Sequence, residues 1–96
     1  MMAGKNLWVE TIGNQTKVGL TATAQDDLGS IGFASLPKVG TEIQKGDEVV
    51  ELEAEKTVVE YESPVNGRVV EVNEEGLKNT KLLDVECAWL FTVEND

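Results

Sequence analysis

Residues 48–62 have the sequence EVVELEAEKTVVEYE, which is compatible with either one helix or a β-hairpin. As a helix, this stretch would place Val49, Leu52, Lys56 and Val59 on one face, and glutamate, alanine and leucine are good helix formers. As a hairpin, residues 49–53 and 58–62 would pair as strands around a tight turn at residues 54–57, because valine, threonine and tyrosine favour strands. The composition favours the hairpin over the helix, and the hairpin would place Lys56 at an exposed tip.

Two similar turn-strand units flank this segment. The tetrapeptide Pro37-Lys38-Val39-Gly40 precedes it, and Pro64-Val65-Asn66-Gly67 follows at a shift of 27 residues. At the same shift Ile43 corresponds to Val70. Few residues are identical, so the match is weak by itself, but it predicts two related units around the central segment.

Short β-branched stretches bounded by turn residues recur along the rest of the chain, which is typical of small all-β domains. A short helix is expected at residues 24–28, with Thr23 as its N-cap and Gly29 as its stop. Residues 73–78 fit a turn or a short helix, and residues 79–88 show no clear pattern. The further strands are expected at residues 7–11, 17–21, 31–36, 67–72 and 89–93, and the one at 31–36 is expected to be buried. We therefore predict one mainly β domain over residues 1–96, a β-sandwich or flattened barrel with one short helix.

The composition excludes several classes of function. The 96 residues carry 18 acidic and 8 basic side chains, a formal charge of −10, no histidine and one cysteine. Without histidine the chain lacks the commonest general base and zinc ligand, so a self-contained hydrolase is not expected. The negative charge repels phosphate backbones and anionic lipid, which argues against nucleic acid and membrane partners and favours a protein with a basic docking face.

The ends and the cysteine count bear on location. The first ten residues lack the features of a secretory signal, and no apolar run is long enough to span a bilayer. A single cysteine cannot form an internal disulfide, which suits a reducing compartment. We expect a cytoplasmic bacterial protein, with a mature mitochondrial protein as the alternative.

Most candidate reactive side chains have a structural explanation. Cys87 has no basic neighbour and follows Glu86, which disfavours a thiolate, so a small half-buried filler is predicted. Trp8 and Trp89 are expected to anchor the core. The solvated faces of the two hairpin strands explain the carboxylates Glu51, Glu53, Glu55, Glu60 and Glu62.

Lys56 is the candidate that remains. By composition alone, it is a solvated surface lysine. On a protruding hairpin, however, its amine is accessible to the active site of another enzyme and can be acylated. Lys56 is therefore a candidate attachment point on a carrier.

Seven motifs occur in order along the chain. They are VGLT (18–21), AQDDLGSI (24–31), LPKVG (36–40), EAEK (53–56), SPVNG (63–67), VEVNE (70–74) and AWL (88–90). In this order they resemble the glycine cleavage system H-protein family, and the resemblance covers nearly the whole chain. The ordered set is far more specific than the lysine motif alone.

The resemblance implies a fold and a site. The family fold is the lipoyl/biotinyl-type β-sandwich, in which a hairpin presents one lysine, so the hairpin is expected for residues 48–62. Because the motif EAEK matches the family's lysine motif, the resemblance implies that Lys56 is the attachment point of lipoic acid, bound as an amide. Glu53 matches an acidic position that modifying enzymes recognise, and Glu55 beside the lysine is expected to contribute. Gly67 matches a glycine that faces the hairpin.

The resemblance also implies partners and a mechanism. Lipoate ligase or an octanoyl or lipoyl transferase would modify Lys56. The lipoyl arm would then shuttle an aminomethyl group between glycine decarboxylase (P protein), aminomethyltransferase (T protein) and dihydrolipoamide dehydrogenase (L protein). The chain itself would be a monomeric carrier and no enzyme, because the cofactor supplies the chemistry.

Two departures from the family pattern keep alternatives open. The segment 73–89 is shorter than in typical family members and lacks their proline-containing helix. The sequence also ends soon after Trp89, without the family's usual C-terminal helix. A lipoyl relay that delivers lipoyl groups to 2-oxoacid dehydrogenase subunits is therefore the alternative function. A biotin carrier is disfavoured because Glu55 and Thr57, not methionines, flank the lysine, and an unmodified binding module is the remaining alternative.

Overall fold

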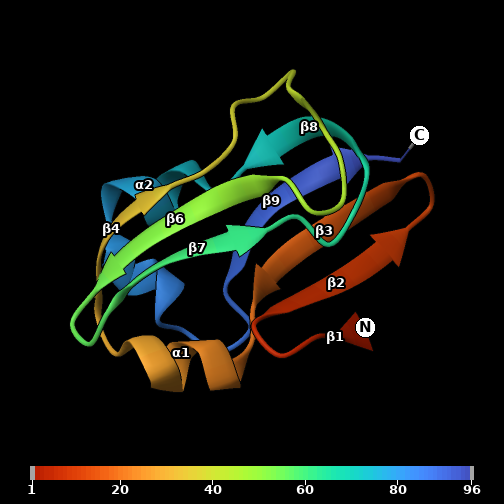
Figure 1. Cartoon of the computed structure of the whole chain (residues 1–96). Helices are drawn as coiled ribbons and strands as arrows, with labels where there is room; N and C mark the ends of the chain where they lie inside the picture. Colours follow the sequence, from red (N-terminus) through yellow and green to blue (C-terminus); the bar gives the residue numbers. More distant parts are fainter. Residues whose placement is uncertain (1, 96) are drawn as a thin grey trace.

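The computed structural model describes residues 2–95, which form two antiparallel sheets with short helices at their edges (Figure 1). The larger sheet has six strands in the order β1-β2-β3-β9-β8-β5, and the smaller has three in the order β4-β6-β7. The strands are β1 (Met2–Ala3), β2 (Leu7–Ile12), β3 (Gln15–Leu20), β4 (Ile31–Ser35), β5 (Glu42–Ile43), β6 (Glu48–Ala54), β7 (Val58–Glu62), β8 (Gly67–Val72) and β9 (Trp89–Glu94). The helices are α1 (Ala22–Leu28), α2 (Glu74–Lys78) and the 3-10 helix η1 (Thr80–Leu83).

The central segment is a hairpin, as predicted. Leu52 lies opposite Val59 and Glu53 opposite Val58 in the antiparallel register of β6 and β7. Along β6 the alternate residues Val50 and Leu52 are buried, which is the period-two burial of a strand with one face on the core. The hairpin and the two-sheet architecture confirm the predicted mainly β fold.

The core lies between the two sheets and is closed at one end by α1. Leu52 from the smaller sheet and Phe91 from the larger one belong to the same buried cluster, together with Leu28 at the end of α1. Each of these three side chains is fully buried. Burying a leucine or phenylalanine contributes about 1.5–3 kcal/mol, so this contact between sheets and helix supports the position of the hairpin.

The two turn-strand units around the hairpin pair with each other. In the register of β5 and β8, Ile43 lies opposite Gly67. The Gly40 amide donates to the Val69 oxygen at 2.7 Å, and the Val69 amide donates to the Thr41 oxygen at 2.9 Å. The weak internal match in the sequence therefore corresponds to two units that meet along one ladder.

The start of α1 corrects one prediction. The N-cap is Thr21, not Thr23, and the helix begins two residues earlier than expected. Thr21 Oγ1 accepts a hydrogen bond from the Ala24 amide at 3.1 Å and donates one to the Lys5 oxygen at 2.7 Å. Thr21 is favoured because it leaves β3 in an extended conformation, which an N-cap requires. The predicted stop at Gly29 is confirmed.

Two predictions of burial are wrong. Phe33 in β4 is 48% exposed, because β4 belongs to a sheet with one face on the core and one in solvent. Cys87 is exposed in the turn before β9, with a φ of +57°, and does not fill the core. Trp8 is buried as expected, whereas Trp89 is half-buried with the Lys17 ammonium 5.3 Å from its ring centroid.

Candidate modification site

The tip of the β6–β7 hairpin is a two-residue bend formed by Glu55 and Lys56. The Ala54 amide donates to the Thr57 oxygen at 3.0 Å and closes the bend. The tip extends to one end of the molecule, beside the end of α1 (Figure 1). Glu55 and Lys56 are both exposed. The fold therefore presents one lysine at the end of a two-stranded arm.

Main-chain hydrogen bonds attach this tip to the last residue of α1 and to the segment that follows it. The Glu55 amide donates to the Ser30 oxygen at 2.8 Å, and the Lys56 amide donates to the Leu28 oxygen at 3.0 Å. Both donors belong to the bend, where no partner strand is available to accept them. The tip is therefore fixed at two consecutive residues, although it lies at the surface.

The lysine side chain makes a third contact with the helix. Lys56 Nζ donates to the main-chain oxygen of Asp26 at 2.8 Å. Asp26 and Leu28 lie in the last turn of α1, where carbonyl oxygens lack partners within the helix and carry partial negative charge. An ammonium group is favourable at this position, so unmodified Lys56 acts as a cap on the C-terminal end of α1.

Gly29 makes the close approach between helix and hairpin sterically feasible. Its φ of +73° ends α1, and its amide donates to the Gln25 oxygen at 2.9 Å. A Cβ atom at this position would lie 2.9 Å from Glu55 Oε1 and 3.5 Å from Lys56 Cε. Glycine at this position therefore both allows the positive φ that ends the helix and leaves room for the hairpin tip to pack against it.

The surroundings of Lys56 fit covalent attachment of an acyl group. A shallow polar hollow beside the tip is lined by Gln25, Asp26, Gly29, Ser30, Glu55, Lys56 and Asp84. The exposed primary amine can form an amide without displacing any buried group. Among residues 2–95, no group of three or more histidine, cysteine, aspartate or glutamate side chains is arranged to hold a metal ion. No helix in the same part of the chain is long and apolar enough to cross a bilayer.

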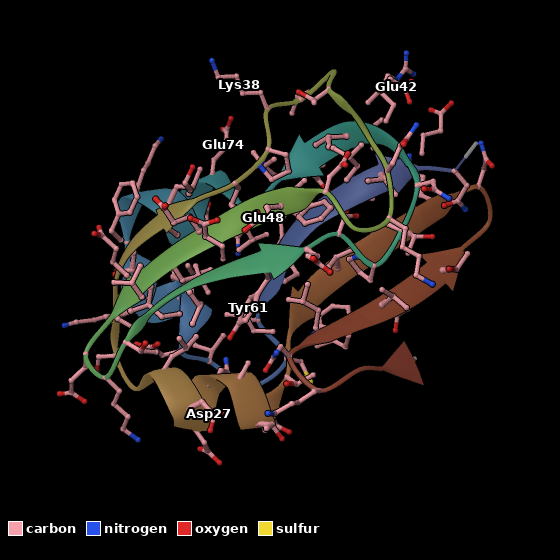
Figure 2. The ribbon with its side chains drawn as sticks, in the orientation of Figure 1. Asp27, Lys38, Glu42, Glu48, Tyr61 and Glu74 are labelled. Atoms are coloured by element: carbon pink, nitrogen blue, oxygen red, sulfur yellow. The ribbon has the colours of Figure 1, made fainter. Side chains whose placement is uncertain are left out.

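Glutamates line the outer side of the hairpin. Glu53 is exposed three residues before the lysine, and Glu51 lies directly opposite Glu60. Figure 2 shows Glu48 on β6, toward the end of the strand away from the tip. A hydrogen bond with Glu60, and then its charge, raise the pKa of Glu48 above the ordinary value. The predicted acidic surroundings of the lysine are therefore present, and they continue along the hairpin.

The structure explains the need for glycine at position 67 by a contact outside the hairpin. Gly67 is the first residue of β8 in the six-stranded sheet, where it pairs with β5, while the hairpin belongs to the other sheet. Gly67 is buried with a φ of +151°, and a Cβ atom there would collide with the main-chain oxygen of Glu94. Its requirement for glycine is thus explained by contact with β9, and a part in enzyme recognition stays a prediction.

The sequence did not indicate the acceptors that hold the tip. The oxygens of Asp26, Leu28 and Ser30 belong to the main chain, so no residue type marks them. The only available signal was Gly29, which predicts a helix end but not what packs against it. The lysine and the glutamates, by contrast, were found from their side chains.

Two antiparallel sheets with one exposed lysine at a hairpin tip form the arrangement of lipoyl-type domains. The chain belongs to the glycine cleavage H-protein family, whose sequence model matches residues 1–96. It is 41% identical over 90 residues to the glycine cleavage system H protein of Bacillus licheniformis, covering 91% of this chain and 71% of that protein. It is 39% identical over 95 residues to the H protein of Bacillus subtilis, covering 96% and 75% of the two chains.

A solved structure supports the same assignment. The crystal structure of a glycine cleavage system H protein from Mycobacterium marinum superposes with a TM-score of 0.85. The two chains are 26% identical, and the match covers 98% of this chain and 81% of the other. Members of the family carry lipoate in the glycine cleavage system and are carriers, not catalysts, which is the function predicted from the ordered motifs.

Proposed function

We propose that Lys56 is the residue that carries lipoic acid and that the chain serves as the H protein of a glycine cleavage system. The observation that carries this proposal is the position of Lys56, exposed on the two-residue tip of a hairpin within a lipoyl-type fold. The hairpin is the only direct connection between strands of the three-stranded sheet. Among the described residues, the other lysines lie in β3, in α2, in η1 or in loops, and none is at the tip of this hairpin.

The chain contributes position, reach and recognition, while the cofactor contributes the chemistry. When bound, the lipoyl group would supply a disulfide that opens to take up a carried group, and the dithiol left after release would be oxidised back to the disulfide. The amides of Glu55 and Lys56 hold the tip on the end of α1, so the arm starts from a fixed point. A fixed origin reduces the conformational search that the arm makes for each active site.

Modification would begin with recognition of the acidic tip. We assign this step to lipoate ligase or to an octanoyl or lipoyl transferase. Glu53 and Glu55 are exposed on either side of Ala54 and are free to meet basic side chains of such an enzyme. The Lys56 amine must leave the Asp26 oxygen and lose a proton before it can attack an activated acyl group.

The partners of the loaded arm are the other components of the system. They are glycine decarboxylase, aminomethyltransferase and dihydrolipoamide dehydrogenase, each of which would receive the tip in turn. We place this work in the bacterial cytoplasm, and we propose that the chain acts as a monomer. The bacterial relatives support the setting, and the exposed tip supports transfer between separate enzymes.

Reconstitution tests the proposal. Lipoylated protein is mixed with glycine decarboxylase, and the exchange of labelled bicarbonate into the carboxyl group of glycine is measured. We expect exchange with the wild-type carrier and none with Lys56→Arg, which keeps the positive charge but cannot form the lipoyl amide. Failure of the lipoylated wild type, together with transfer of its lipoyl group to a 2-oxoacid dehydrogenase subunit, would replace the proposal by the relay function.

A further inference from the structure

The outer face of the three-stranded sheet combines acidic and apolar side chains. In each strand the alternate residues point into the core, as Ala34, Val50 and Leu52 do. Their neighbours face solvent. We call this surface the hairpin face, and it consists of Phe33, Ser35, Glu48, Glu51, Glu53, Val58, Glu60 and Glu62.

The hairpin face is ordered in rows across the strands. In the row next to the lysine tip, Glu53 of β6 lies between Phe33 of β4 and Val58 of β7. Phe33 is 48% exposed and Val58 is 61% exposed, so the carboxylate is flanked by two accessible apolar side chains. In the next row, Glu51 lies between Ser35 and Glu60. The face is therefore partly apolar near the tip and acidic further along.

No basic side chain within the sheet balances this charge. The sequences of β4, β6 and β7 contain five glutamates and neither lysine nor arginine. Within residues 2–95, the one ion pair is Arg68–Glu94, which lies on the other sheet. Like charges directly opposite each other on neighbouring strands destabilise a sheet, as at Glu51 and Glu60. This arrangement weakens the free protein, but it favours binding to a surface of positive charge.

We propose that the hairpin face is a docking surface for a partner enzyme whose active-site entrance carries lysine and arginine side chains beside an apolar one. The inference rests on the proposed function, because it describes where the enzymes that use the arm would bind. A partner seated on this face would have Lys56 at its edge, so the arm could enter the active site while the sheet stays bound. Phe33 and Val58 would pack against the apolar side chain, and the glutamates would pair with the basic ones.

Acylation of Lys56 strengthens the same preference. Residues 48–62 contain six glutamates and one lysine, and amide formation removes the only positive charge among them. The loaded carrier is thus more negative around the tip than the unmodified chain. A basic entrance would bind the acylated form more tightly, because the repulsive ammonium is gone.

A charge-matched pair of variants tests the face. The test variant is Glu51→Gln/Glu60→Gln, and the control is Glu10→Gln/Glu71→Gln, which removes the same charge around a hollow on the six-stranded sheet. With glycine decarboxylase as the probe, we expect the test variant to raise KM for the lipoylated carrier about tenfold at low salt, with kcat unchanged. The control is expected to stay within about twofold of wild type, because distant charges are largely screened.

The salt dependence of KM distinguishes the electrostatic contribution of the hairpin face from its apolar contribution. The effect of the glutamate substitutions is expected to shrink as salt is raised, because ions screen exposed charges. Val58→Ser, at a position 61% exposed, is expected to raise KM by a factor that salt does not reduce. Equal KM values for the test and control variants would overturn the proposal.

A second readout keeps this proposal separate from the proposed function. Backbone amide signals of the labelled, lipoylated carrier are followed by NMR while decarboxylase is added. We expect the changes to centre on the rows of Glu51 and Glu53, and this result would support the docking surface even if glycine exchange failed. Changes centred on α1 and residues 84–88 instead, or no changes at all, would contradict it.

Discussion

Lys56 Nζ donates a hydrogen bond to the main-chain oxygen of Asp26, with 2.8 Å between the two atoms. The group proposed to carry the cofactor is therefore also a positively charged cap on the last turn of α1. Acylation replaces an ammonium group with a neutral amide, so it removes the charge from this contact. The chemistry of the tip and the stability of the helix end are linked through one side chain.

Replacing Lys56 with glutamine should loosen the end of α1. We expect Lys56→Gln to lower the free energy of unfolding by about 0.5 kcal/mol, whereas Lys56→Arg should retain most of the stability. Hydrogen exchange at the Gly29 and Lys56 amides should accelerate in the glutamine variant. Equal exchange in wild type and both variants would show that the ammonium does not cap the helix.

Gly67→Ala should affect folding more than modification. The added methyl group meets the main-chain oxygen of Glu94 at a φ of +151°, and we expect a loss of about 2–3 kcal/mol of stability in denaturant unfolding. Gly46→Ala is the control, because it also has a positive φ but open space around it, and it should cost about 1 kcal/mol.

The same pair of variants distinguishes packing from recognition. If Gly67 is needed only for packing against β9, folded Gly67→Ala should be acylated at the rate of Gly46→Ala. Slower acylation of Gly67→Ala than of Gly46→Ala, at a temperature where both variants are fully folded, would instead show that the modifying enzyme recognises position 67.

Glu53→Gln should slow the attachment of lipoate. The Glu53 carboxylate is exposed beside the tip, and loss of one exposed charge pair typically changes binding by about 0.2–1 kcal/mol, or up to about fivefold in the specificity constant. The measurement is the acylation rate of the unmodified protein by lipoate ligase, with Glu10→Gln as the control. Unchanged acylation kinetics in Glu53→Gln would refute a recognition role for Glu53.

The pairing of Glu48 and Glu60 should make stability depend on pH. The hydrogen bond with Glu60 and the charges of Glu60 and Glu62 raise the pKa of Glu48 above its ordinary value of 4.5. The folded chain then holds this proton more tightly than the unfolded chain, so stability is lost as pH rises from the ordinary pKa through the raised one.

Glu60→Gln isolates this effect. We expect the variant to melt at a higher temperature than wild type at pH 7, because the substitution removes the charged neighbour that raises the pKa of Glu48. Its advantage should shrink as the pH is lowered toward 4.5, since protonation of Glu48 then relieves the wild type as well. An advantage that is the same at both pH values would argue against repulsion between these two side chains.

The sequence predicted the two strands of the hairpin and the lysine between them because both depend on side-chain type and spacing. Valine-rich stretches bounded by glycine and proline marked the strands, and Lys56 stood in the turn between two of them. The exposure of Phe33 was not predictable in the same way. An apolar residue on a strand faces either the core or solvent according to which face the sheet buries, and this is decided by the other sheet.

The position of Gly67 shows a related limit. The family resemblance correctly marked a glycine, but the reason for it lies in β9, which is distant in sequence. The attachment of the tip to α1 was likewise invisible, because main-chain oxygens of any residue could accept those bonds. The chemical type of each side chain could thus be used for prediction from the sequence, whereas the contacts between distant segments became known only from the structure.

Peptide mass mapping of the native protein, isolated from bacterial cells that are supplied with lipoate, tests the attachment of lipoate to Lys56 directly. We predict one lipoyl group per chain, attached at Lys56, and none in a Lys56→Arg variant expressed in the same way. A lipoyl group on another lysine, a biotinyl group on Lys56 or an unmodified Lys56 would show that Lys56 does not carry lipoate in this protein.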